Sequence, residues 1–322
     1  MKLLPLFVLI LTLTGCFKKT ADLTPKQELG KQLFFDPRLS SDGSISCNSC
    51  HNVMNGGVDS RKFAMGVNGA LGGRNSPTVF NAVFLSTQFW DGRAKDLADQ
   101  AKGPLINPVE MGNVDHNEVI SRLKKIPGYV TEFKAVFGEN SFNIDNLADA
   151  IAEYETTLTT LNSPFDKGSM TELQKKGQET FTNAGCVACH SGDHFAGPKL
   201  PTGQGFFQKF PTMPNTEADA KYNFSDDLGL FTVTGKDSDK SMFRVPTLRN
   251  IALTAPYFHN GAVNSLDEAV RVMGETQLGK KLSTDEVKEI TAFLNALTGT
   301  VPVQIMPTLP PTLGTSVAEE VF

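Results

Sequence analysis

The sequence lacks the features that mark several classes of protein. It has no excess of positive charge, with 30 Lys and Arg against 35 Asp and Glu, so it has no general electrostatic reason to bind nucleic acid. Alternating apolar and polar residues, which would predict strands, are few. Hydrophobic residues still make up 40% of the chain, enough for a buried core. Its 322 residues suggest about two domains of roughly 100–200 residues each.

The chain also lacks an apolar run of the about 20 residues that cross a bilayer. The run Leu3–Leu13 is shorter, follows Lys2 and is typical of an export signal. It ends in Leu13-Thr14-Gly15-Cys16, which resembles a bacterial lipobox. We expect cleavage before Cys16 and lipidation of its thiol, and therefore a periplasmic protein that meets a membrane only through this anchor. The alternative is an ordinary signal peptide with an incidental cysteine.

Cysteine is scarce, with five in the chain. Apart from Cys16, they form two Cys-x-x-Cys pairs, each followed at once by histidine, in Cys47–His51 and Cys186–His190. Cys-x-x-Cys-His is the signature of covalent haem attachment, in which histidine ligates the iron. Zinc and disulfides are the competing interpretations. Two copies in an exported chain favour two haem c groups. Their binding residues would be Cys47, Cys50 and His51, and Cys186, Cys189 and His190.

The two attachment sites follow similar helical segments. Thr24–Phe34 precedes the first and Leu173–Phe181 the second, and each contains a glycine followed four residues later by phenylalanine. This weak internal repeat predicts an all-α fold of two cytochrome c-like haem domains with long loops and little strand. A further apolar helical face runs over Ile144–Leu161 and is broken at Asn162-Ser163-Pro164.

That break sets the predicted domain boundaries. We expect a signal segment over residues 1–16, a first haem domain over 21–162 and a second over 163–300. Residues 301–322 are rich in proline and predict an extended strap over the surface.

The sixth iron ligand decides what each haem can do. Methionine or histidine there closes the iron and suits electron transfer, whereas an open position admits a substrate. The sequence positions of His116 and His194 favour solvated or capping roles for their side chains. His259 lies in an aromatic turn that could line a haem pocket. On spacing alone, Met273 fits a core methionine better than a ligand. The residues by themselves therefore leave the sixth ligands open.

Several longer motifs resemble the bacterial dihaem cytochrome c peroxidase family. They occur in one order between about Leu29 and Pro311. They are Asn75–Thr78, Gln88–Ala94, Asn107–Met111, Val245–Asn250, Thr254–Gly261 and Val272-Met273 with Gln277–Gly279.

The resemblance implies a different role for each haem. The first haem, on His51, would be the peroxidatic site, with Glu110 as acid and base on its open face and Gln100 beside it. The second haem, on His190 and Met273, would be the high-potential group that receives electrons. Residues 21–162 would then be the peroxidatic domain and residues 163–300 the electron-transfer domain.

The resemblance also implies the groups between and around the haems. Trp90 would lie in the electron path, and Asn75, Thr254 and Pro256 would help to hold one calcium ion. The substrate would be hydrogen peroxide, the electron donor a reduced cytochrome c or a cupredoxin, and the assembly a homodimer.

One position departs from the family pattern. Members commonly carry a histidine that caps the peroxidatic iron in the oxidised enzyme, and the matching residue here is Val67. Valine cannot ligate iron, so we expect the oxidised enzyme to accept peroxide without prior reduction. Met65 is the rival ligand, although ferric haem prefers nitrogen or oxygen donors.

Two other functions remain as alternatives. Dihaem oxidases that modify a protein-borne tryptophan are related to this family, but they place a tyrosine where Met273 stands here. A non-enzymatic dihaem electron carrier would have both irons six-coordinate, and Glu110 together with Val67 argues against it.

Overall fold

The computed structural model describes residues 23–313 and is mainly helical. The predicted signal segment and Cys16 therefore lie outside the described residues. The helices are α1 (Pro25–Phe35), α2 (Cys47–Cys50), α3 (Leu97–Ile106), α4 (His116–Leu123), α5 (Pro127–Phe137), α6 (Ile144–Glu155), α7 (Glu172–Ala184), α8 (Glu217–Tyr222), α9 (Phe231–Thr234), α10 (Leu266–Leu278) and α11 (Thr284–Ala296). Short 3-10 turns occur at Pro37–Leu39, Val67–Gly69, Ala82–Phe84, Cys186–Ala188, Phe224–Asp226, Asp237–Asp239 and Ile251–Leu253.

Strand is confined to one antiparallel pair, β1 (Phe207–Lys209) and β2 (Met242–Arg244), within the described part of the chain. In its register Phe207 lies opposite Arg244. The all-α prediction is confirmed. None of the helices over residues 23–313 combines the length and the apolar character that a membrane crossing requires.

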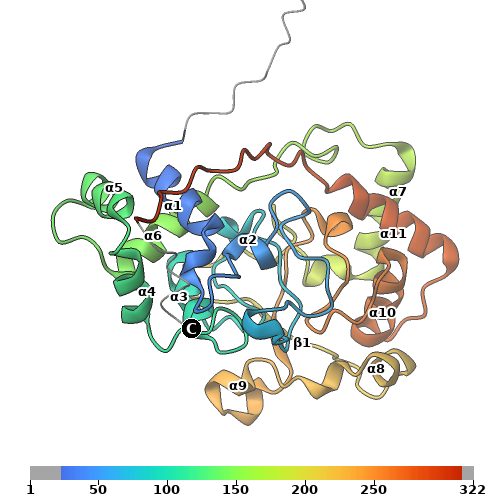
Figure 1. Cartoon of the computed structure of the whole chain (residues 1–322). Helices are drawn as coiled ribbons and strands as arrows, with labels where there is room; N and C mark the ends of the chain where they lie inside the picture. Colours follow the sequence, from blue (N-terminus) through green and yellow to red (C-terminus); the bar gives the residue numbers. More distant parts are fainter. Residues whose placement is uncertain (1–22, 314–322) are drawn as a thin grey trace, which may run out of the picture.

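The repeat seen in the sequence is a repeat of helix packing. In the first half α1 packs on α6, and a Cβ atom added at Gly30 would lie 1.8 Å from the Ala150 carbonyl oxygen. In the second half α7 packs on α11, and a Cβ at Gly177 would lie 1.9 Å from the Glu289 carbonyl oxygen. Each glycine is therefore the point where two helices come too close for any side chain. Figure 1 shows α1 beside α6 on one side of the molecule and α7 beside α11 on the other.

The same local signals start both lead-in helices. Thr24 caps α1 and Thr171 caps α7, and in each case a glutamine at the third helical position returns the hydrogen bond in a capping box. Each helix then carries its phenylalanine into a separate core: Phe34 is fully buried with α6, and Phe181 is 4% exposed beside Phe293.

Helix α6 is shorter than its apolar pattern predicts. The pattern runs from Ile144 to Leu161, but α6 ends at Glu155 and the chain continues without helix through Leu158 and Thr160. Leu158 is still fully buried. The apolar spacing therefore reflects burial in the core both within α6 and in the non-helical residues that follow it.

The last described residues return to the first half of the molecule. Residues 301–313 are extended and run from α11 toward α1 and α6 (Figure 1). The Tyr154 hydroxyl donates to Gln304 Oε1 at 2.9 Å, and Arg38 Nη1 donates to the Pro310 carbonyl at 2.9 Å. These contacts fix the strap across the first core.

Candidate functional site

The first attachment sequence forms one short helix at the wall of a cavity. Ser46 precedes α2, which presents Cys47 and Cys50 three residues apart, and the His51 N–H donates to the Cys47 carbonyl at 2.9 Å. The His51 Nδ1 bonds the Pro77 carbonyl at 3.0 Å. A carbonyl only accepts, so Nδ1 carries the proton and Nε2 keeps its lone pair for a metal. Burial lowers the pKa of His51, which keeps the ring neutral.

The second attachment sequence follows α7 in a comparable way. Gly185 ends α7 with φ of 105°, a left-handed conformation that favours glycine, and a 3-10 turn over Cys186–Ala188 follows. The His190 N–H donates to the Cys186 carbonyl at 3.0 Å, and its Nδ1 bonds the Phe195 carbonyl at 3.1 Å. His190 is 8% exposed, and burial lowers its pKa.

The two sites fit covalently attached haem. All four described cysteines are free thiols, and each pair lines a different cavity together with its histidine. The cavity at His51 has a volume of about 350 Å³ and the cavity at His190 about 190 Å³. We call them the first and second cavity. Each offers two thiols and an imidazole nitrogen on one wall, the donor set that haem c requires.

The first cavity brings together the residues predicted for peroxide chemistry. Glu110, Gln100 and Trp90 all line it with His51. Asn107 Nδ2 donates to Glu110 Oε1 at 2.9 Å. Burial raises the pKa of Glu110, while the charge of Arg93 and the Asn107 hydrogen bond lower it. These opposing influences suit a carboxyl group that both takes up and releases a proton.

The second cavity has a mostly apolar wall. Met273, on α10, lines it among side chains such as Leu248 and Val270. His259 also lines it, stacks on Phe243 with ring centres 4.4 Å apart, and has a buried Nε2 without a hydrogen-bond partner among the described residues. Burial lowers the pKa of His259 to about 4. His259 thus lines a haem pocket, as its aromatic turn suggested, beside Met273.

The remaining candidates lie in different places. Asn75 lines the first cavity, and its N–H donates to the His259 carbonyl at 2.7 Å. Thr254 and Pro256 line neither cavity. His116 and His194 are also outside both: the His116 Nε2 bonds the Lys102 carbonyl, and His194 stacks on Phe84.

The loop of Met65 and Val67, where the sequence departs from the family pattern, packs against Glu110. The Val67 N–H donates to the Glu110 carbonyl at 2.9 Å, and a Cβ added at Gly112 would lie 2.6 Å from a methyl of Val67. Val67 is 3% exposed, and Met65 is 40% exposed. Neither residue lines the first cavity.

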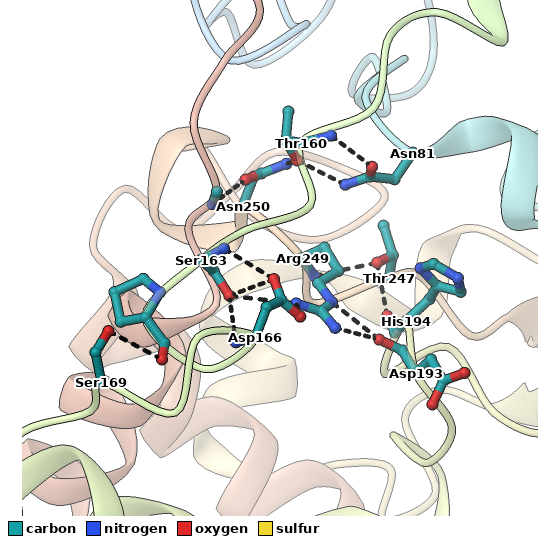
Figure 2. A network of polar contacts seen from close by, with 12 residues as sticks. Asn81, Thr160, Ser163, Asp166, Ser169, Asp193, His194, Thr247, Arg249 and Asn250 are labelled. Carbon is teal, nitrogen blue, oxygen red and sulfur yellow. Dashed lines mark hydrogen bonds and ion pairs between the residues drawn. The ribbon is translucent and has the colours of Figure 1, made fainter.

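A polar network holds the loop that positions His190 (Figure 2). Arg249 donates through Nε and Nη2 to the Asp193 carbonyl, at 2.9 and 2.7 Å, and pairs with Asp166. The Thr247 hydroxyl donates to the His194 carbonyl at 2.7 Å. The next residue, Phe195, supplies the carbonyl that His190 bonds, so this network fixes the orientation of the second imidazole.

The network continues to the first half of the chain. Asn81 and Thr160 exchange two hydrogen bonds, of 2.8 and 2.9 Å, and Asn250 also donates to the Thr160 hydroxyl (Figure 2). A Cβ added at Gly299 would lie 1.5 Å from the Thr160 carbonyl. Residues on both sides of the predicted boundary at 162–164 are therefore tied together by buried polar contacts.

Two cavity residues were not found from the sequence. Glu155, at the end of α6, is 4% exposed, lines the first cavity and has an Oε2 without a partner among the described residues. Burial raises its pKa to about 8. Arg244 is 5% exposed and lines both cavities. The available signal for Glu155 was its spacing: it lies four residues after Ile151, on the apolar face of its helix.

Two thiol pairs, each beside a neutral imidazole at the wall of its own cavity in an all-α fold, define a c-type cytochrome with two haem sites. A model of the di-haem cytochrome c peroxidase family matches residues 24–174. The chain is 48% identical over 293 residues to cytochrome c551 peroxidase of Pseudomonas aeruginosa, covering 88% of this chain and 82% of that one. It therefore belongs to the di-haem cytochrome c peroxidase family, and the predicted resemblance is confirmed.

Other relatives place the chain within this family. Cytochrome c551 peroxidase of Nitrosomonas europaea is 43% identical over 290 residues, covering 88% of this chain and 83% of its own length. The methylamine utilization protein MauG of Methylorubrum extorquens is 33% identical, covering 91% and 84%. A solved MauG-like protein associated with microbial copper homeostasis has a TM-score of 0.75 at 27% identity, covering 86% of this chain and 91% of its own. The identity is higher to the two cytochrome c551 peroxidases than to MauG.

Proposed function

We propose that this protein reduces hydrogen peroxide to water, H2O2 + 2 e⁻ + 2 H⁺ → 2 H2O, with electrons from a reduced cytochrome c or a cupredoxin. The observation that carries the proposal is the placement of Glu110 and Gln100 in the same cavity as His51 and its two thiols. When bound, the two haems would relay the donor's electrons and provide an iron at which peroxide can react. The protein supplies the position of the substrate and the transfer of its proton.

Glu110 is the proposed proton carrier. Its carboxylate takes the proton from one peroxide oxygen and gives it to the oxygen that leaves as water, so the group ends each cycle as it began. The amide of Asn107 fixes Oε1, which leaves Oε2 to face the substrate. Gln100 lines the same cavity and would hold the peroxide by hydrogen bonding.

The second cavity is the proposed site at which electrons arrive. His190 and Met273 would hold the second haem, and a sulfur ligand among apolar side chains favours a high potential. Trp90 lines both cavities, and its Nε1 donates to the Asn75 carbonyl at 2.8 Å. A ring that borders both cavities and is held by this hydrogen bond supports the proposed role of Trp90 in the electron path.

We further propose that the oxidised enzyme needs no prior reduction, because the loop of Met65 and Val67 offers no histidine to the first cavity. The test is peroxide turnover by the fully oxidised protein holding two haems, measured with and without a preceding reduction step. Equal initial rates are expected. A lag that only pre-reduction removes, or a first haem that fails to bind cyanide when oxidised, would contradict this part of the proposal.

We also propose that the protein binds one calcium ion, is exported to the periplasm, is held at a membrane by a lipid on Cys16 and forms a homodimer. Asn75 would contribute to the calcium site together with Thr254 and Pro256, and waters would complete the shell because three protein groups are few for calcium. Removal of calcium with a chelator should lower turnover, and calcium but not magnesium should restore it. Labelling with a radioactive fatty acid tests the anchor, and sedimentation tests the dimer.

The competing function is the oxidation of a tryptophan in another protein, which is the activity of the related dihaem oxidases described above. Met273 in the second cavity favours the peroxidase, because a high-potential relay suits a small electron donor. Rapid oxidation of a reduced cytochrome c by peroxide, without crosslinking of an added protein substrate, is the outcome that separates them.

A further inference from the structure

Arg244 is a buried arginine that forms no ion pair with any carboxylate that the structure describes. It ends β2 and is 5% exposed. Its Nε donates to the Phe89 carbonyl at 3.0 Å, and its Nη1 donates to the Val245 carbonyl at 3.2 Å. Within residues 23–313 its Nη2 donates to no group. A guanidinium has more N–H groups than these two bonds use, and buried arginines are normally paired with an acid.

The nearby acids are already engaged. Asp91 is the acid whose charge acts on Arg244, but it pairs with Arg74 at 2.6 Å and with Arg93 at 2.8 Å. Arg74 pairs in addition with Asp227 at 2.6 Å. Asp91 and Asp227 are thus already paired with other arginines, and neither forms an ion pair with Arg244 in the described part of the chain. A buried guanidinium without a paired acid favours the binding of a further anion.

Arg244 stands where it can reach both haem sites. Together with Trp90 it forms the set of described residues that line the first and the second cavity alike. Its N–H donates to the Trp90 carbonyl at 2.9 Å, and its place in β2 opposite Phe207 fixes its backbone. A haem c carries two propionate carboxylates at the porphyrin edge remote from its thioether bonds. Each cavity is lined by its own two thiols and by Arg244.

We propose that Arg244 binds a propionate of each haem, so that one guanidinium bridges the two cofactors. This rests on the two-haem character of the family and not on the identity of the substrate. The unused N–H groups form a planar fork, which suits carboxylate oxygens better than an ammonium does. A cation held between two haems favours the reduced state of both, since reduction removes one positive charge from each iron. Arg244 is therefore a positioning and tuning residue for both sites.

The test is a redox titration of the holoprotein, in which absorbance and EPR report each haem. In Arg244→Gln both midpoint potentials should fall. At a fixed ambient potential, the ratio of reduced to oxidised haem should drop about tenfold at each site, equivalent to about 59 mV for one electron. Arg244→Lys keeps the positive charge, so both midpoint potentials should stay close to those of the native protein. Its single ammonium cannot grip two carboxylates as the fork does.

Arg122→Gln is the matched control. Arg122 is also buried, at 7% exposed, and also donates to backbone carbonyls, but it lines neither cavity. It should leave both potentials unchanged. If Arg244→Gln shifted the midpoint potential of one haem alone, Arg244 would not bridge the two haems. If it retained two haems and shifted neither potential, Arg244 would contact neither haem.

A second measurement does not depend on the glutamine variant folding. Resonance Raman spectra of the native protein should show propionate bending modes of strongly hydrogen-bonded carboxylates, and Arg244→Lys should move those modes at both haems. Modes typical of solvated propionates in the native protein would overturn the proposal. A protein without peroxide turnover but with these potentials and spectra would refute the proposed function and leave the bridge intact.

Discussion

The two haem cavities are alike at their attachment sequences and differ in the other residues that line them. Each histidine donates Nδ1 to a backbone carbonyl, of Pro77 at 3.0 Å and of Phe195 at 3.1 Å. The first cavity adds Glu110 and other polar groups within about 350 Å³, whereas the second adds Met273 and apolar side chains within about 190 Å³. The same attachment chemistry is therefore combined with different lining residues in the two cavities, and this difference underlies the two proposed roles.

Replacing Glu110 by glutamine should produce the largest effect and should touch only the first site. Glutamine keeps the shape but cannot carry the proton, so peroxide turnover should fall by about 10²–10⁴-fold. The potential and spectrum of the second haem should not change. Steady-state oxidation of a reduced cytochrome c measures the loss. Glu153→Gln is the control and should retain full activity, because Glu153, on α6, is 35% exposed and lines neither cavity.

Met273→His should make the second site resemble a low-potential haem. Nitrogen in place of sulfur lowers the midpoint potential, and each loss of about 59 mV makes acceptance of an electron about tenfold less favourable. Turnover should fall while cyanide binding at the first haem persists. Potentiometry and the near-infrared absorption of a sulfur–iron bond report the change. If the native protein lacks that absorption, sulfur is not the sixth ligand, and His259 in the same cavity becomes the next residue to replace.

Glu155 should make the stability of the first half depend on pH. Its folded-state pKa of about 8 lies above its ordinary value of 4.5, so the folded protein holds a proton that the unfolded chain has released. Stability should fall as pH rises from about 4.5 to about 8, by a few kcal/mol in order of magnitude. Glu155→Gln should flatten this slope in urea unfolding at pH 6 and pH 8. An unchanged slope would mean that Glu155 is satisfied by a group such as the haem.

The smallest effects should come from the residues that orient the two imidazoles. Thr247 bonds the loop of Phe195, and Thr78, next to Pro77, donates to the Gly56 carbonyl at 2.8 Å. Thr247→Val should shift the potential of the second haem alone, and Thr78→Val that of the first alone. Each should cost about 1 kcal/mol of stability. Redox titration and urea unfolding measure both variants, and each variant is the control for the other. A shift in the potential of the opposite haem would contradict the assignment of that threonine to its imidazole.

The parts of this architecture that follow from local chemistry were predictable. The haem sites and the repeated glycines follow from short spacings in the sequence. The end of α6 was not, because the buried Leu158 continues the apolar spacing beyond the helix. Arg244 was missed because nothing near it in the sequence shows that a strand end will meet two cavities formed by distant segments.

One residue from each half of the chain also stands in the wall of the other half's cavity. Trp90 precedes the predicted boundary at 162–164 and lines the second cavity, and Arg244 follows it and lines the first. The halves resemble duplicated units, yet neither is self-sufficient. A gene split at the boundary would yield two fragments, each with an incomplete haem pocket until the other binds. Duplication alone thus does not give modularity, because each cavity is completed by a side chain from the other half of the chain.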